Sequence, residues 1–191
     1  MAITSLSIIS CNDTKKNIEP IDDTMTEKNY SGKPITHDYD AKIDSIISQM
    51  TLEEKIGMLH GFSMFTTEGV ERLGIPELKM ADGPLGVREE ISRDSWAAAG
   101  WDNDFATYYP AGAGVSATWN TELLYAFGNS VGEEARARDK DILLSPAINI
   151  IRTPFGGRTY EYFTEDPFLN KKLAVPFIVG LQENDVAACV K

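Results

Sequence analysis

Three short, mainly apolar runs, separated by longer stretches with helical periodicity, constrain the fold of this chain more than any other feature. The runs span residues 78–81, 141–145 and 186–190, and each is too short for a buried helix. Between them, apolar residues recur at steps of three and four, which is typical of amphipathic helices. Short buried strands that alternate with helices predict a parallel sheet. The sequence therefore predicts an α/β fold, either a doubly wound sheet or a β/α barrel.

The expected helices begin at residues that are good N-caps. Thr51 and Glu54 form a capping-box sequence, Asn120 precedes a long amphipathic stretch, and Asp166-Pro167 opens the last helix. Pro176 should kink that last helix, because its ring removes a donor and crowds the preceding turn. The apolar faces expected for the first, third and last helices are Ile43, Ile46, Ile47 and Met50; Leu123, Phe127, Val131 and Ala135; and Leu169, Leu173, Phe177 and Leu181.

Composition excludes several classes of protein. The 18 Lys and Arg residues face 29 Asp and Glu residues, which gives a net charge of −11, and no basic cluster occurs. This balance argues against a nucleic-acid partner, because phosphate binding needs neutralising cations. No apolar stretch approaches the roughly 20 residues that span a bilayer. We predict no cofactor and no metal, since His37 and His60 are isolated and no phosphate-binding glycine fingerprint follows a strand.

The first 39 residues differ from the rest of the chain. A short apolar run ends at Cys11 and a polar stretch follows, which resembles the end of a bacterial lipoprotein signal, although no Lys or Arg precedes the run. Residues 1–11 are therefore interpreted as a partial lipoprotein signal or a chance match. The first interpretation predicts a periplasmic or cell-surface protein with membrane attachment through a lipidated Cys11. Residues 12–39 lack a hydrophobic period and are expected to be a polar linker or arm.

The residues that could carry chemistry follow the three strands. Asp82 and Arg88 come after the first, Arg152 and Arg158 after the second, and Lys191 after the third. Because the carboxyl ends of parallel strands meet at one edge, where ligands bind, we expect these side chains to share one mouth. A carboxylate with several cations suits a neutral polyol such as a sugar, whose hydroxyls both donate and accept hydrogen bonds.

Aromatic residues could contribute to the same site, and its charged residues could instead have purely structural roles. The loop from Arg88 to Pro110 holds Trp96, Trp101, Tyr108 and Tyr109, which could stack on the apolar face of a sugar ring. The alternatives are structural. Asp82 could merely bond its own backbone in an Asp-Gly-Pro turn, and Arg152 and Arg158 could form scaffolding ion pairs with Glu161, Glu165 or Asp166.

Five segments of the sequence resemble the N-terminal domain of family 3 glycoside hydrolases, the β-glucosidases and related exo-acting enzymes. The resemblance runs in order from about Ser48 to Lys191 and implies that residues 40–191 are the first part of a (β/α)8 TIM-type barrel. A whole barrel needs about 250 residues, so we expect an N-terminal fragment. The segments that carry the resemblance are residues 82–88, 117–120, 132–136, 149–152 and 157–167.

The resemblance also implies a site and a reaction. Asp82, Arg158 and Lys191 align with family residues that hold the sugar hydroxyls in the −1 subsite. The nucleophile and the general acid/base are expected beyond Lys191, so no catalytic residue is predicted within the chain. The implied reaction is retaining hydrolysis of terminal β-linked sugars, with an oligosaccharide or β-glycoside as substrate.

Two alternatives stay open, namely an inactive carbohydrate-binding or cell-surface protein and an unrelated β/α-barrel lyase. The chain alone is expected to be inert and marginally folded. Its third strand would be an edge that displays Val186, Ala188 and Val190.

Overall fold

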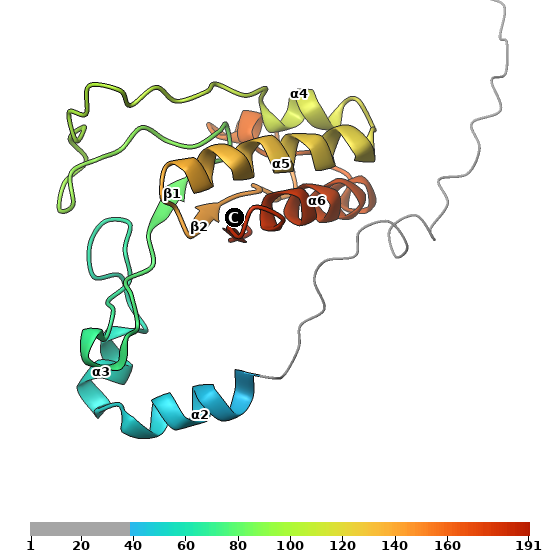
Figure 1. Cartoon of the computed structure of the whole chain (residues 1–191). Helices are drawn as coiled ribbons and strands as arrows, with labels where there is room; N and C mark the ends of the chain where they lie inside the picture. Colours follow the sequence, from blue (N-terminus) through green and yellow to red (C-terminus); the bar gives the residue numbers. More distant parts are fainter. Residues whose placement is uncertain (1–38) are drawn as a thin grey trace, which may run out of the picture.

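Two long helices lie side by side on one face of a small parallel sheet, and a helical arm extends away from them (Figure 1). The computed structural model describes residues 39–191. The predicted lipoprotein signal with Cys11, and the predicted polar arm except for its last residue, lie outside the described residues. Within residues 39–191, no helix has both the length and the apolarity needed to cross a membrane.

The sheet has three strands, β1 (Met80–Asp82), β2 (Ile142–Leu144) and β3 (Ala187–Ala188), in the order β1-β2-β3. Both pairings are parallel, with Asp82 opposite Leu144 and Leu143 opposite Ala188. The predicted alternation of strands and helices is confirmed. Within the described residues the three strands form an open sheet and do not close a barrel. Because they are parallel, all three strands end at the same edge of the sheet.

Helices α4 (Gly112–Ser116), α5 (Thr121–Ala137) and α6 (Pro167–Gln182) connect the strands. The predicted caps are confirmed, because the Asn120 side chain accepts from the Leu123 amide at 3.0 Å and the Asp166 side chain accepts from the Phe168 amide at 2.8 Å. These bonds satisfy donors that a helix start leaves unpaired. Helix α6 continues through Pro176 to Gln182 without interruption.

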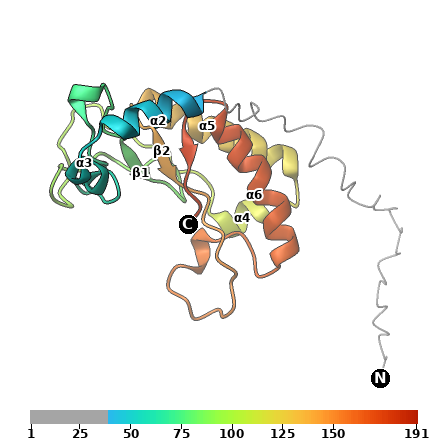
Figure 2. The ribbon, with the colours of Figure 1, turned by 90° about the horizontal axis from the view of Figure 1, so that it is seen from below.

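Glycines allow α5 and α6 to approach closely (Figure 2). A Cβ atom at Gly128 would lie 2.1 Å from the carbonyl oxygen of Phe177, and one at Gly180 would lie 2.3 Å from that of Tyr125. Any side chain at either position would push the helices apart. The rings of Phe127 and Phe177 meet edge to face at 5.2 Å beside this contact.

The core lies between these helices and the sheet. The predicted face of α6 is confirmed at Leu173, Phe177 and Leu181, which are buried, while Leu169 packs at the margin. The predicted face of α5 is wrong at its first position. Leu123 is 42% exposed and Leu124 is fully buried, because the helix turns about 100° per residue and the sheet faces the second of the two leucines.

The N-terminal arm consists of α2 (Asp40–Gln49) and α3 (Leu52–Gly57), followed by the short turn η2 (Glu71–Leu73). The predicted capping box is confirmed, since the Thr51 hydroxyl accepts from the Glu54 amide while the Glu54 carboxylate accepts from the Thr51 amide. Arg72 donates to the Glu54 carboxylate at 2.6 Å and to the Gln49 carbonyl at 2.9 Å. These bonds tie the two helices to the following turn.

The predicted burial of two apolar faces differs from the structure. Ile43 and Ile47 of α2 are 48% and 45% exposed, and no residue of α2 is buried. The helix lies in the arm, apart from α5 and α6 (Figure 1). Val186 was expected on display but is buried, because it joins the core before β3 begins. Val190, two residues beyond the end of β3, is exposed as predicted, whereas Ala188 is partly buried against the core.

Candidate functional site

A carboxylate and an ammonium group meet at the carboxyl edge of the sheet. Asp82 is the last residue of β1, and the Lys191 ammonium donates to its Oδ1 atom at 2.7 Å. The backbone of Lys191 is held in place, since its amide donates to the Pro146 carbonyl at 3.0 Å and its own carbonyl accepts from the Ile148 amide at 2.8 Å. Two residues that the sequence placed at different strand ends are therefore in direct contact.

Asp82 also borders a pocket of about 370 Å³. Arg88 and Arg158 line the same pocket and Lys191, which is not part of the lining, contacts Asp82, so the structure brings together all but one of the predicted site residues. The exception is Arg152, which is exposed on the loop after β2 and does not line the pocket. The other side chains of the lining include Tyr108, Tyr160 and Glu161.

The turn after β1 shapes one wall of the pocket. Gly86 has a φ angle of +115°, and a Cβ atom there would lie 2.4 Å from the Thr107 carbonyl oxygen, so only glycine fits. The Arg88 amide then donates to the Asp82 carbonyl at 3.0 Å, and the Tyr109 amide donates to the Leu85 carbonyl at 3.0 Å. This turn fixes the backbone of Arg88 relative to Asp82.

Arg158 is held by a buried carboxylate. Its guanidinium pairs with Glu161, three residues further along, and the Glu161 side chain is almost completely buried. The contact with the Glu161 carboxylate raises the pKa of Arg158 above its ordinary value, and the negative charge of Asp82 acts more weakly in the same direction. The scaffolding pair that the sequence offered as an alternative therefore exists. Arg158 nevertheless faces the pocket, so the pair orients a group of the site.

The long loop after Arg88 is anchored at both ends by α5 and the residues that follow it. Arg138 pairs with the Asp104 carboxylate and donates to the carbonyls of Arg88 and Phe105 at 3.2 and 3.1 Å. Lys140 likewise pairs with Glu90. These anchors could not be predicted from the sequence, since Arg138 and Asp104 are 34 residues apart and nothing in their local pattern pairs them.

The aromatic residues of this loop have different surroundings. Tyr108 lines the pocket and is 79% exposed, whereas Tyr109 packs on Phe127 at 5.3 Å in the core. Trp96 lies over Arg88, with the guanidinium carbon 4.9 Å from the ring centroid. Trp101 lines a different hollow. Tyr160 in the pocket wall was not among the aromatics that the sequence suggested.

That second hollow is larger, about 510 Å³, but its chemistry is less suited to a ligand. It contains neither Asp82, Arg158 nor Lys191, and its ionic side chains are largely paired with one another, as Glu77 is with Arg93. The pocket bordered by Asp82 is therefore the better candidate site. Among residues 39–191, no group of three or more potential metal ligands comes together.

Most of the chain matches one family of known proteins. Residues 45–191 match the model of the family described as glycosyl hydrolase family 3 N terminal domain. The chain is 48% identical to β-glucosidase BoGH3A of Bacteroides ovatus over 156 residues, which is 82% of this chain and 21% of that protein. It is 35% identical to an exo-α-(1→6)-L-arabinopyranosidase of Bifidobacterium longum over 145 residues, 76% of this chain and 19% of that protein.

Solved structures of β-glucosidases are also similar to this chain. The structure of β-glucosidase 3B from Thermotoga neapolitana in complex with glucose superposes with a TM-score of 0.70 at 36% identity. The match covers 78% of this chain and 22% of that one. The chain thus spans about a fifth of the length of the curated relatives that it matches.

Proposed function

Because this chain belongs to glycosyl hydrolase family 3 through its N-terminal domain, we propose that it is part of a glycosidase that removes terminal β-linked sugars. In this proposal the described residues supply part of the −1 subsite, where the terminal sugar binds. The proposal extends to the whole protein what the names of the relatives, most of them β-glucosidases, state for those proteins.

The observation that carries the proposal is the group of charged side chains around one pocket at the carboxyl edge of the sheet. Asp82 offers acceptors, whereas Arg88, Arg158 and Lys191 offer donors, and a sugar hydroxyl can use both. Charge-assisted bonds of this kind are stronger than neutral ones and are directional. They would fix the orientation of the ring and therefore the position of its anomeric carbon.

The two carboxylates in the pocket wall are already engaged with cations, Asp82 with Lys191 and Glu161 with Arg158. We therefore assign them to binding and orientation. The nucleophile and the general acid/base belong, in this proposal, to the part of the protein beyond Lys191. A retaining enzyme carries these two carboxyl groups about 5–5.5 Å apart.

The test is an assay of the full-length protein with an aryl β-glucoside and, as a second substrate, an aryl α-L-arabinopyranoside. We expect that either substrate is hydrolysed with retention of configuration at the anomeric carbon. NMR of the first-formed product measures this configuration. Inversion would contradict the retaining mechanism. Binding of glucose without turnover of either substrate would instead support the alternative of an inactive carbohydrate-binding protein.

Attachment to a membrane and a periplasmic or cell-surface location are a separate proposal, which rests on the residues around Cys11 alone. The test is metabolic labelling of the bacterial cells with an alkyne fatty acid. Labelling of the parent protein that disappears in Cys11→Ala and persists in Cys189→Ala is expected. Equal labelling of both variants, or no labelling of the parent, would overturn it.

A further inference from the structure

The three cations of the proposed subsite are held in different ways. Lys191 is paired with Asp82, and Arg158 is paired with Glu161. Arg88 forms no ion pair with any carboxylate of residues 39–191, and the contact of its guanidinium within that range is with the indole ring of Trp96. The face of Trp96 thus occupies the place that a carboxylate takes for the other two cations.

This difference has a chemical consequence. A carboxylate that holds an arginine accepts some of its five N–H groups, which are then no longer available to a ligand. An indole ring attracts the guanidinium through its π electrons and has no oxygen acceptor, so the N–H groups stay available. Since the Arg88 backbone is already fixed by Asp82 and Arg138, the remaining freedom of this residue lies in its side chain.

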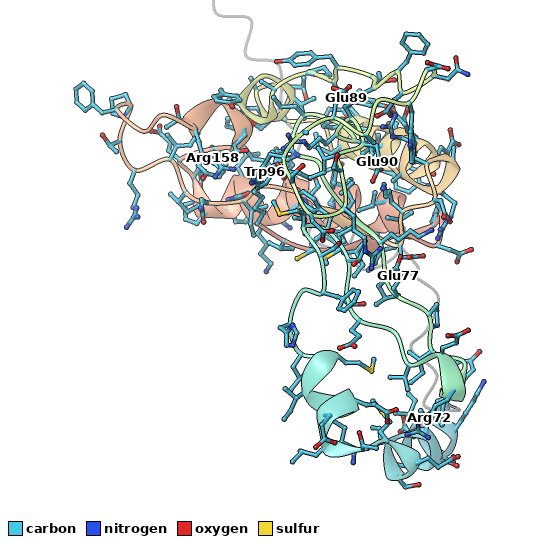
Figure 3. The ribbon with its side chains drawn as sticks, turned by 90° about the vertical axis from the view of Figure 1, so that its left-hand side faces the viewer. Arg72, Glu77, Glu89, Glu90, Trp96 and Arg158 are labelled. Carbon is cyan, nitrogen blue, oxygen red and sulfur yellow. The ribbon has the colours of Figure 1, made fainter. Side chains whose placement is uncertain are left out.

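Trp96 itself is supported from a second side. Its ring meets Phe65 edge to face, with centroids 5.8 Å apart and an interplanar angle of 87°. The residue as a whole is nevertheless 62% exposed. In Figure 3, Trp96 and Arg158 lie in the same part of the molecule, away from the α2–α3 arm.

We infer that Trp96 is a positioning residue that holds the Arg88 guanidinium toward the sugar while leaving its donors free. The inference rests on the proposed function, because it assigns a role within the same subsite. In this role Trp96 acts through Arg88 alone. The contribution of Trp96 to sugar binding should therefore disappear when Arg88 is replaced by an uncharged residue.

Trp101 provides a matched control. It lies on the same loop and is 60% exposed, close to the value for Trp96, but it lines the other hollow. The full-length protein is compared with Trp96→Ala, Trp96→Phe and Trp101→Ala. Two quantities are measured, the Kd for glucose by calorimetry and kcat/KM for an aryl β-glucoside. We expect Trp96→Ala to weaken both by about fivefold, the upper end for an exposed cation–π contact. Trp96→Phe should restore most of the loss, and Trp101→Ala should have no effect.

A double-mutant cycle separates positioning from general structural damage. In an Arg88→Met background, Trp96→Ala should change the Kd by less than about twofold, because the group on which it acts is gone. Equal effects of Trp96→Ala and Trp101→Ala, or additive effects of Trp96→Ala and Arg88→Met, would overturn the inference. If the parent binds glucose but does not hydrolyse the substrate, the proposed function fails while the cycle still decides the inference. If the parent does neither, both are wrong.

Discussion

The Asp82 carboxylate and the Lys191 ammonium lie 2.7 Å apart although 109 residues separate them in the chain. Asp82 ends β1 and Lys191 follows β3, and these two strands are not neighbours, because β2 lies between them. The pair therefore crosses the end of the middle strand. Both side chains are partly accessible to solvent, and an ion pair in such surroundings contributes only about 0–1 kcal/mol to stability. Its importance is expected to lie in ligand binding.

Substitution of Asp82 tests that expectation. Asp82→Ala should lower kcat/KM for an aryl β-glucoside by about 100-fold or more, since each hydrogen bond to a charged group is worth roughly 1.5–3 kcal/mol. The melting temperature should change little. Asp102→Ala, on the exposed loop, is the control and should be close to the parent in both measurements. Near-parent kinetics for Asp82→Ala would make Asp82 a turn residue only.

The pairing of Arg138 with Asp104 predicts a larger effect on stability. The Arg138 and Asp104 side chains are 13% and 5% exposed, and removal of one partner of a buried pair costs about 3–5 kcal/mol. Asp104→Ala should therefore lower the free energy of unfolding in urea by several kcal/mol. The neighbouring substitution Asp102→Ala should leave it unchanged. Similar unfolding curves for the two variants would show that the loop is not held through Asp104.

The capping box at the start of α3 gives a prediction about pH. The hydrogen bond from Arg72, followed by that from the Thr51 amide, lowers the pKa of Glu54 below its ordinary value of about 4.5. A carboxyl group whose pKa is lower in the folded state adds stability above its unfolded pKa, and this contribution is lost as the pH falls through the folded pKa. Glu54→Gln should therefore melt below the parent at neutral pH, with a difference that shrinks on acidification below about pH 4.5.

Glu53→Gln is the matched control for that experiment, because Glu53 lies in the same helical turn outside the capping box. Its melting temperature should follow the parent across the whole pH range. A difference between Glu54→Gln and the parent that stays constant down to about pH 2 would contradict the assignment to ionisation of Glu54.

The 191-residue chain expressed by itself is predicted to be inert toward aryl β-glycosides and to unfold over a broad temperature range. Ile43 and Ile47 of α2 and Val190 near the edge strand are exposed apolar groups without a cover among the described residues. Such surfaces favour association over cooperative folding. Turnover that a carboxylate substitution within the chain abolishes would contradict inertness. A sharp two-state transition of a monomer would contradict marginal folding.

The sequence was informative wherever a feature depended on local pattern. The strands, the caps at Thr51, Asn120 and Asp166, and the meeting of Asp82 with Lys191 follow from periodicity, side-chain chemistry and the shared edge of parallel strands. The burial of Leu124 in place of Leu123 could not be predicted, because adjacent positions of a helix differ in the direction in which they face, and the sheet sets that direction.

The contacts made by the long loop could not be predicted from the sequence, for a different reason. Arg138 finds Asp104, and Trp96 covers Arg88, only once the turn at Gly86 has set the course of the loop. Charged and aromatic residues are common in loops, so their identity alone does not select a partner. The apolar face of α2 was predicted to be buried but is exposed. An amphipathic pattern predicts a buried side but does not say which element covers it.

The loop is clamped at Glu90 and at Asp104, and between these residues Arg93 pairs with Glu77. Gly100, in that stretch, has a φ angle of +75°, and a Cβ atom placed there would have no neighbour within 4 Å. A change of length confined to Gly100 is expected to leave these clamps in place, and with them the register of Asp82 and Arg88. Gly100 is therefore the position at which a protein engineer could alter the loop with the least expected effect on the sugar-binding pocket.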